Sequence, residues 1–505
     1  MHDVVIIGSG LGALVCGAML SREGLRVRVV EKNARIGGCL QTFTRGGRTF
    51  DTGIHYVGGL EEGQILNQYF KFLGVRDRVE VARMDTGAFD TVVSGEREYG
   101  LGMGYERFAA GLKGYFPAEA DNIDRFCELL RRVGSTMSVE WLRRGVISEG
   151  AMRYMELGAA ATIDSAFADP ELCRVVAGTS MLYGGMSDRT SLYHYGMINH
   201  SFIESAWRFV GGAGQLADAL AAIIRSHGGE VSTGNEVTAI RLRDDRVSGV
   251  EVNGGEAGGG EFIEARHVIS DIHPAVTFRL MEKSPRIRKA YTSRLASLAN
   301  SSAVFTVYLA LKPGAMPCLN RNFYIHGERI GGNLPGSVRA IEYDMERDSP
   351  RTVMFSMQAT RHPFADTASI LCPIDFEPFA RWEHTHVGQR GAGYLDLKAH
   401  LAERIIDFTA SRFPELRGAI DHIHTSSPLT WRDYTGSPGG SAYGIAKDWH
   451  SPLTTLIPVD TRFENLLLTG QNVNVHGVTG VTVTAALTCA RLLGEEYIAK
   501  KIGDA

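Results

Sequence analysis

Three small residues and one glutamate near the start of the chain have types and a spacing suited to binding a dinucleotide. Gly8, Gly10 and Ala13 follow the pattern G-x-G-x-x-G/A, and Glu31 stands about twenty positions later. In this pattern the first glycine permits a tight turn, and the second lets the backbone approach a pyrophosphate. The small third residue allows a helix to pack closely on a strand, and the acid can accept hydrogen bonds from a ribose diol. The pattern therefore predicts a site for the phosphates and one ribose of a dinucleotide.

The elements that must position these residues can be inferred from the surrounding sequence. Residues 4–7 and 27–30 are short apolar runs, typical of buried parallel strands. The small residues between them indicate a helix whose N-terminus offers N–H donors and a partial positive charge to a phosphate. A glycine-rich turn without a ligand is the alternative. The order of strand, turn, helix, strand and acid favours the dinucleotide site.

A second glycine turn narrows the choice of dinucleotide. Gly37 and Gly38 follow Glu31 in the stretch KNARIGGCLQTF, where a plain NAD site would continue to a third strand. The acid followed by a glycine pair resembles the flavoprotein superfamily that includes amine oxidases and phytoene desaturases, in which this segment lies beside FAD. The resemblance implies FAD as the cofactor. At this end of the chain it implies contacts from Gly8, Gly10, Leu11, Gly12, Ala13, Glu31, Lys32, Gly37 and Gly38.

Residues 211–240 contain a further glycine pattern that opens a helix. An NAD(P)H site is one interpretation. However, residues 205–210 (SAWRFV) make a poor buried strand, and Arg241 rather than an acid follows the next apolar run. In the superfamily that the chain resembles, such a segment returns to the FAD domain and brings the backbone of Val237 near the adenine.

Residues 465–498 have a third strand, glycine turn and helix pattern, with the helix expected over residues 478–496. The resemblance places this turn against the ribityl chain and the pyrimidine side of the flavin, where a helix N-terminus stabilises the charge of the reduced ring. An ordinary structural helix is the alternative. The superfamily usually has aspartate at the position of Gln471. A glutamine can still hydrogen-bond the ribityl hydroxyls. Because it lacks the negative charge of an aspartate, it favours the reduced, anionic cofactor. The implied contacts are Gly470, Gln471, Gly477, Val478, Gly480 and Val481.

The segment FDTGIHYVG at residues 50–58 resembles the corresponding segment of retinol saturases, a branch of the phytoene desaturase and carotenoid isomerase group. Residues 269–281 also resemble a segment of this group. The resemblance implies hydride transfer from flavin N5 to a conjugated double bond, while an acid protonates the neighbouring carbon. His55 and Tyr56 are then candidate catalytic residues, as proton donor or positioning group, and His476 is a weaker third candidate. The alternative is that the histidine binds backbone and the tyrosine packs in the core.

The predicted fold class is α/β. The resemblance implies that a Rossmann-like FAD-binding domain of the GR2 flavoprotein type is interleaved with an α+β substrate domain that has an antiparallel sheet and a helical lid. Residues 304–312 alternate like a half-exposed strand of that sheet. We expect residues 1–75, 205–290 and 430–505 in the FAD-binding domain, and residues 76–204 and 291–429 in the substrate domain.

A conjugated polyene lipid requires a long apolar tunnel. Residues 126–146 and 181–198 mix apolar side chains with polar ones and include arginine pairs at 131–132 and 143–144. One interpretation is a tunnel mouth that rests on a membrane surface. The other is a solvated helix face over ordinary core. We expect a cytoplasmic protein, with peripheral membrane association as the alternative.

Composition limits the remaining functions. A net charge of −4 gives no electrostatic case for nucleic acid. The seven cysteines stand far apart without metal-ligand spacing, which predicts no metal site and fits a reducing compartment. No secretory signal precedes the first strand, and no long uncharged apolar run indicates a membrane span.

Three functions share the predicted flavin. A saturase reduces a double bond, a desaturase oxidises one, and a cis-trans isomerase leaves the net redox state unchanged; the His55–Tyr56 pair favours the saturase. A flavin amine oxidase is a more distant alternative, which would need a carboxylate-binding arginine and an aromatic cage. The resemblance implies a hydrophobic polyene as substrate. Since no second dinucleotide site is convincing, we expect a separate electron donor or reduction by a substrate.

Overall fold

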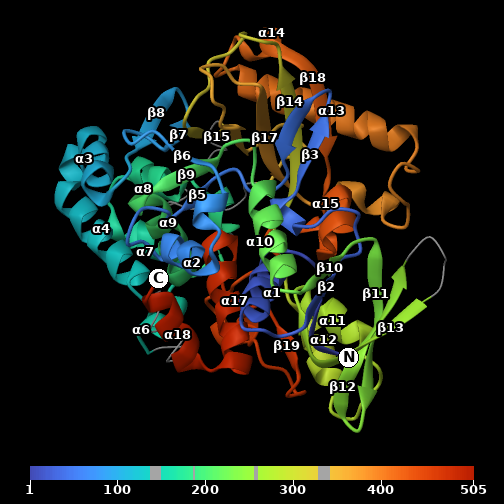
Figure 1. The fold of residues 1–505 in the computed structure, drawn as a ribbon. Coiled ribbons are helices and arrows are strands. Elements are labelled where there is room, and N and C mark those ends of the chain that lie inside the picture. The colour runs from blue at the N-terminus through green and yellow to red at the C-terminus, as the bar shows by residue number, and fades with distance from the viewer. Residues whose placement is uncertain (137–148, 186–187, 255–259, 328–341) are drawn as a thin grey trace.

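The computed structural model describes residues 1–136, 149–185, 188–254, 260–327 and 342–505, and it contains two large sheets (Figure 1). The first sheet has the order β10-β2-β1-β13-β12-β11, and β19 pairs with β13. Its strands are β10 (Glu230–Ser232), β2 (Val27–Val30), β1 (His2–Ile7), β13 (Gly260–Ser270), β12 (Arg246–Gly254), β11 (Asn235–Arg243) and β19 (Leu466–Leu468). The strands from β10 to β13, together with β19, are parallel, whereas β11, β12 and β13 pair antiparallel.

The second sheet has the order β18-β14-β17-β16-β15-β7-β8 and is antiparallel except between β15 and β7. Its strands are β18 (Ile420–Ser426), β14 (Ala303–Leu311), β17 (Thr367–Ile374), β16 (Thr352–Met357), β15 (Asn322–His326), β7 (Asp90–Ser94) and β8 (Arg97–Leu101). Two small sheets join β3 (Thr42–Arg45) to β4 (Arg48–Asp51), and β5 (Val57–Gly58) to β9 (Ala206–Phe209) and β6 (Val81–Arg83).

The helices divide between the two sheets and a separate helical group. Figure 1 shows α3, α4, α7, α8 and α9 gathered on one side of the molecule, and α1, α10 and α17 around the parallel strands. The described helices are α1 (Leu11–Arg22), α2 (Ile65–Leu73), α3 (Tyr105–Tyr115), α4 (Ala120–Gly134), α6 (Glu149–Met155), α7 (Ala159–Ala166), α8 (Pro170–Ala177), α9 (Leu192–Glu204), α10 (Gly214–Ser226), α11 (Pro274–Leu280), α12 (Lys289–Ser297), α13 (Ala392–Ala410), α14 (Leu416–Ala419), α15 (Pro428–Thr435), α16 (Pro452–Thr455), α17 (Gly477–Leu493) and α18 (Glu495–Gly503). No helix within the described ranges is both long and apolar enough to cross a bilayer.

The first βαβ unit forms as its residue types predict. Val4–Ile7 are buried in β1, and every residue of α1 from Gly12 to Ser21 is buried. A Cβ on Gly17 would lie 2.7 Å from Cδ1 of Ile224, so the absence of a side chain lets α1 approach α10 closely. The α/β class is confirmed. The domain limits stay a prediction, although the first sheet is built from segments near both ends and the middle of the chain.

The strand predicted over residues 304–312 differs from the prediction in its exposure. β14 is buried at all nine positions because its two faces pack on different clusters. Phe305 lies in a core shared with α13, whereas Tyr308 packs against Phe43 and Phe50 of the β3–β4 hairpin. A sheet covered on both faces no longer needs polar residues on one of them.

Two local predictions were also inexact. Residues 206–209 form the strand β9, with Arg208 only 1 % exposed. This buried guanidinium donates to the carbonyls of Leu319 and Arg321 and to Oδ1 of Asn322, which makes a charged residue compatible with the strand.

The helix expected over residues 478–496 is divided at Gly494, whose φ of +97° ends α17 before α18 begins.

Candidate functional site

The parallel strands end at one edge of the first sheet, and the predicted dinucleotide residues meet there. Gly8 follows β1, Glu31 follows β2, Asp271 follows β13, and Gly470 comes shortly after β19. These four residues line one pocket of about 280 Å³. Ligands of open parallel sheets bind in such a crevice at the carboxyl ends of the strands.

Most of the predicted cofactor contacts lie in this dinucleotide pocket. Ala13 is the exception at the first turn: it is completely buried inside α1 and lines neither of the two large pockets. Gly480 lines the neighbouring cavity described below. The predicted residues that line the dinucleotide pocket are Gly8, Gly10, Leu11, Gly12, Glu31, Lys32, Gly37, Gly38, Val237, Gly470, Gln471, Gly477, Val478 and Val481.

Glu31 is held in place by the glycine turn itself. Its Oε2 accepts from the backbone N–H (3.0 Å) and the hydroxyl (2.6 Å) of Ser9, and its Oε1 accepts from the N–H of Asn33 (2.8 Å). These bonds fix the carboxylate at the end of β2, where it lines the pocket and can accept from a ribose hydroxyl.

Asp271 is a residue of this pocket whose role the sequence did not reveal. Desolvation raises the pKa of its carboxyl to about 7, and the N–H groups of Ala13 and Gly10 oppose this rise. A Cβ at Gly12 would lie 2.6 Å from Oδ1 of Asp271 and 2.9 Å from the backbone nitrogen of Gly470. Glycine is therefore required where α1, the end of β13 and the C-terminal turn converge. The position of Asp271 directly after a buried strand is the signal that could have identified it.

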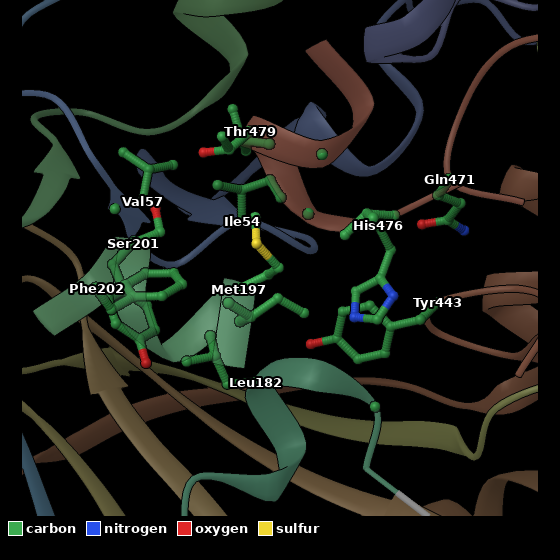
Figure 2. A pocket seen from close by; sticks show the side chains of 18 of the residues that line it. Ile54, Val57, Leu182, Met197, Ser201, Phe202, Tyr443, Gln471, His476 and Thr479 are labelled. Carbon is green, nitrogen blue, oxygen red and sulfur yellow. The ribbon is translucent and has the colours of Figure 1, made fainter. Parts of the chain in front are cut away.

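A second, larger cavity of about 600 Å³ continues from the dinucleotide pocket. Cys39, Ile54, Gln471, Gly477 and Val478 line both, so one ligand can extend from the first into the second. Figure 2 shows Val57, Ser201 and Phe202 on one side of this cavity, and Gln471, His476 and Tyr443 on the other. Its apolar lining includes Ile54, Val57, Leu182, Met197, Ile198, Phe202, Val304, Met354 and Leu371.

His55 and Tyr56 both line the cavity, but their surroundings differ. Desolvation, and then the charge of Arg208, lower the pKa of His55 to about 4, so its imidazole is neutral near pH 7. Its Nε2 is buried and has no hydrogen-bond partner within the described ranges. Tyr56 is 6 % exposed, and its hydroxyl donates to Oδ2 of Asp90 at 2.8 Å.

Tyr56 belongs to a buried polar network that the sequence did not predict. The hydroxyls of Tyr56 and Tyr324 lie 2.6 Å apart, and Nδ2 of Asn322 donates to Oδ1 of Asp90 at 2.9 Å. Arg208 then donates to Oδ1 of the same asparagine at 2.7 Å. Desolvation raises the pKa of Asp90 to about 7 and that of Tyr56 well above its ordinary value. A charged residue at the start of the apolar strand β7 is the sequence signal that could have drawn attention to Asp90.

His476, the third candidate, lies at the start of α17. Its ring packs on Tyr443 with centroids 4.6 Å apart (Figure 2). Desolvation and the charge of Lys447 lower the pKa of His476 to about 3, so it is neutral at ordinary pH. A neutral imidazole is a weak acid, which makes a packing or hydrogen-bonding role the better explanation of this residue.

The basic segments predicted at a tunnel mouth are described only in part. Arg143 and Arg144 lie outside the described residues, whereas Arg131 is on α4 with its guanidinium 4.5 Å from the centroid of the Tyr105 ring. Gly134, Ser135, His200 and Glu204, on or directly after α4 and α9, line the cavity. Membrane association stays a prediction.

The chain was compared with known proteins. The sequence profile of the family described as flavin containing amine oxidoreductase matches residues 14–366, which is more than half of the chain. The chain belongs to this family. It is therefore an oxidoreductase, and its cofactor is FAD. This flavoenzyme is also 26 % identical to the all-trans-retinol 13,14-reductase of Rattus norvegicus, over 97 % of its own chain and 85 % of that protein.

Two further comparisons bear on activity and fold. Prolycopene isomerase 1 of an Oncidium hybrid cultivar is 26 % identical, over 63 % of this flavoenzyme and 56 % of the isomerase. The crystal structure of an oxidoreductase from Methanosarcina mazei superposes with a TM-score of 0.61 at 17 % identity, over 96 % of this chain and 98 % of that chain. The likeness to the Methanosarcina mazei structure concerns the fold alone.

The residues present fit FAD. The first glycine turn lines the dinucleotide pocket through Gly8, Gly10 and Gly12 at the N-terminus of α1, where a pyrophosphate can bind. In the cavity, Nε2 of His55, Oγ of Ser201 and Nε1 of Trp431 are buried and have no hydrogen-bond partner within the described ranges. Buried polar atoms of this kind are normally satisfied, and the polar edge of a flavin or a substrate can supply the partners.

Proposed function

We propose that this flavoenzyme reduces a carbon–carbon double bond of a conjugated polyene lipid, in the manner of a retinol saturase. The observation that carries the proposal is the large cavity. Its lining is mainly aliphatic and aromatic, and it opens into the dinucleotide pocket at Cys39, Ile54 and Gln471. A flat, apolar chain can therefore lie against a ring that enters from that pocket. The relatives named all-trans-retinol 13,14-reductase and prolycopene isomerase support a polyene substrate.

FAD, when bound, supplies hydride transfer at N5. The chain's own contribution is to orient the substrate, exclude water and provide a proton. Leu182, Met197 and Phe202 offer the apolar surface for orientation (Figure 2). Hydride addition to one carbon leaves negative charge on the conjugated neighbour, so a proton must reach that carbon to complete the reduction.

Tyr56 is the better placed proton donor. Its phenol lines the cavity and is backed by Asp90, whose pKa near 7 allows the carboxyl to carry a proton at neutral pH. When Tyr56 gives its proton to the substrate carbon, its oxygen becomes the acceptor of the 2.8 Å contact, and the proton of the neutral Asp90 carboxyl passes to it, leaving Asp90 as the carboxylate. His55 lacks such a reserve, because its imidazole is neutral and its Nε2 has no partner in the described chain. We assign His55 to positioning.

Desaturation and cis-trans isomerisation use the same cavity and remain the alternatives. Amine oxidation is less compatible with the lining. Among the described residues of the cavity wall there is no arginine or lysine to bind a substrate carboxylate, and Glu204 is the sole acid. A substrate ammonium or carboxylate would therefore be desolvated with little compensation.

The direction of the reaction can be tested anaerobically with the holoenzyme. The bound flavin is photoreduced, all-trans-retinol or a carotenoid is added, and the flavin and polyene absorption bands are followed together. Reoxidation of the flavin with a blue shift of the polyene band is expected, since saturation shortens the chromophore. A changed cis band with the flavin still reduced would indicate an isomerase instead.

A second arm separates the oxidative alternatives. With oxidised flavin, a red shift of the polyene together with flavin bleaching would indicate a desaturase. If amines bleach the flavin while no polyene does so in either arm, the enzyme is an amine oxidase and the proposal is wrong. Rapid reduction of the flavin by NADPH alone would contradict the expectation of a separate electron donor.

A further inference from the structure

Lys447 is a buried cation that the proposed chemistry does not use. It is 7 % exposed, and its Nζ donates to the backbone carbonyls of Thr455 (3.0 Å), Asn472 (3.0 Å) and Val473 (3.2 Å). Three acceptors match the three N–H bonds of an ammonium, one more than a neutral amine can offer. No carboxylate in the described part of the chain forms an ion pair with it. Buried charges are normally paired, so this one lacks its counter-charge.

The position of Lys447 indicates where that counter-charge arrives. Two of its three carbonyl partners belong to the turn at residues 470–476, between β19 and α17. This turn lines the dinucleotide pocket through Asn472 and the cavity through Val475. α17 then begins at Gly477 with no acidic residue in its first turn, so its N-terminus adds a partial positive charge at the same place. A cofactor that extends from one pocket into the other must pass this turn.

The other titratable groups around Lys447 do not cancel its charge. The imidazoles of His194, His476 and His273 interact with it, and desolvation lowers the pKa of each, to about 3 for His476 and about 4 for His273. His476 and His273 are therefore neutral above pH 5, and burial likewise favours the neutral form of His194. Arg189 lines the same small cavity as Lys447. The carboxylate of the next residue, Asp448, accepts hydrogen bonds from His450.

We propose that Lys447 is a positioning residue that, through the turn at residues 470–476, stabilises the two-electron-reduced, anionic form of the bound flavin. Reduction to that form adds two electrons and one proton to the ring and leaves one negative charge on it. A nearby cation without a counter-ion lowers the free energy of this state relative to the neutral oxidised ring. Gln471, in the same turn, adds no opposing charge. The inference rests on the FAD cofactor and does not depend on which substrate is reduced.

The midpoint potential of the bound flavin tests this inference. Lys447→Gln keeps N–H donors for the turn but removes the charge, and Lys447→Met removes both. The potential is measured in each holoenzyme at pH 6.5 by titration with dithionite against a reference dye. We expect both variants to favour the oxidised flavin at least tenfold more than the wild type, which is a fall of about 30 mV for a two-electron couple. An unchanged potential in a Lys447→Gln protein that retains FAD would overturn the proposal.

A control lysine is available beside the second sheet. Lys312 is exposed and also donates to a backbone carbonyl, that of Gly418 at 2.8 Å, away from both pockets. Lys312→Gln should leave the potential unchanged. If Lys447→Gln weakens FAD binding equally in both redox states, the ammonium serves the cofactor's phosphates or the turn alone, and the proposal is wrong.

The wild-type protein provides a test that needs no variant. Desolvation lowers the pKa of Lys447 to about 7 in the free chain, and an anionic ring would raise it. Above pH 7, reduction should therefore take up one additional proton at Lys447. The midpoint potential should then fall about 30 mV more per pH unit between pH 7 and 9 than between pH 5.5 and 6.5. A slope that does not steepen above pH 7 would contradict the inference even if neither variant folds.

Discussion

The hydroxyl of Tyr56 lies 2.8 Å from Oδ2 of Asp90, and the carboxyl group is completely buried. This pair connects the wall of the large cavity with the first residue of β7 in the second sheet. A phenol alone is a poor acid at neutral pH. A protonated carboxyl behind it can replace the proton that the phenol gives up, which makes the pair more effective than either group.

The first prediction concerns the phenol. Tyr56→Phe should slow reduction of the polyene about 100- to 10,000-fold, because the final proton transfer loses its donor. The measurement is single-turnover reoxidation of the photoreduced flavin by all-trans-retinol. Tyr324→Phe is the control, since it removes the other partner of the Tyr56 hydroxyl and leaves Asp90 in place; it should lose less than tenfold. A Tyr56→Phe enzyme with the wild-type rate would show that Tyr56 is not the proton donor.

The second prediction concerns pH. If protonated Asp90 reloads Tyr56, the rate of polyene reduction should fall as the pH rises through about 7, where the carboxyl loses its proton. Asp90→Asn should be slow and should lack this decline, because an amide does not titrate. Rates are compared between pH 5.5 and 8.5 in the same single-turnover assay. An identical decline in wild type and Asp90→Asn would assign the titration to another group.

The third prediction concerns the glycine turn. Gly12→Ala should bind little FAD, because the new Cβ would lie 2.6 Å from Oδ1 of Asp271 and 2.9 Å from the nitrogen of Gly470, and relief of this clash must displace segments that line the dinucleotide pocket. The readout is the ratio of flavin to protein absorbance after purification. Gly114→Ala on α3 is the matched control, since no atom lies within 4 Å of its added Cβ. Full flavin content in Gly12→Ala would show that the pocket tolerates the displacement, and the prediction would be wrong.

The fourth prediction concerns stability. Asp51 accepts from the N–H of Ala213 (2.7 Å) and from Nε2 of Gln358 (3.1 Å), yet desolvation raises its pKa from 3.8 to about 7. Between these two values the folded chain keeps a proton that the unfolded chain releases, so the free energy of unfolding should fall as the pH rises from about 4 to 7. Above pH 7 this contribution should no longer change.

Urea unfolding at pH 5 and pH 7 checks that sign. Asp51→Asn should reduce the pH dependence by up to about 1.4 kcal/mol per pH unit, the value for one titrating group. The exposed Asp504→Asn, near the C-terminus, should leave the dependence unchanged. A wild-type protein that becomes more stable between pH 5 and 7 would show that buried histidines with lowered pKa values, such as His55, dominate instead.

The sequence by itself determined the parts of this protein that depend on neighbours along the chain. Gly8, Gly10 and Glu31 lie within one βαβ unit, so the spacing of strand, turn and acid was enough to place them in one pocket. The second glycine turn and the C-terminal turn carried the same kind of local signal. For these segments the residue types dictate the backbone, and the backbone creates the site.

Tertiary structure alone decided which buried polar groups meet at the wall of the cavity and behind it. Tyr56, Asp90 and Tyr324 come from three distant segments, and no periodicity shows that their oxygens meet. In the sequence, nothing distinguishes Lys447 from a surface lysine. Only the folded chain brings the turn at residues 470–476 around its Nζ. The physical reason is desolvation. The rest of the folded chain excludes water from Asp90 and Lys447, which raises the pKa of the first and lowers the pKa of the second. This exclusion of water depends on the fold and is not visible in the sequence.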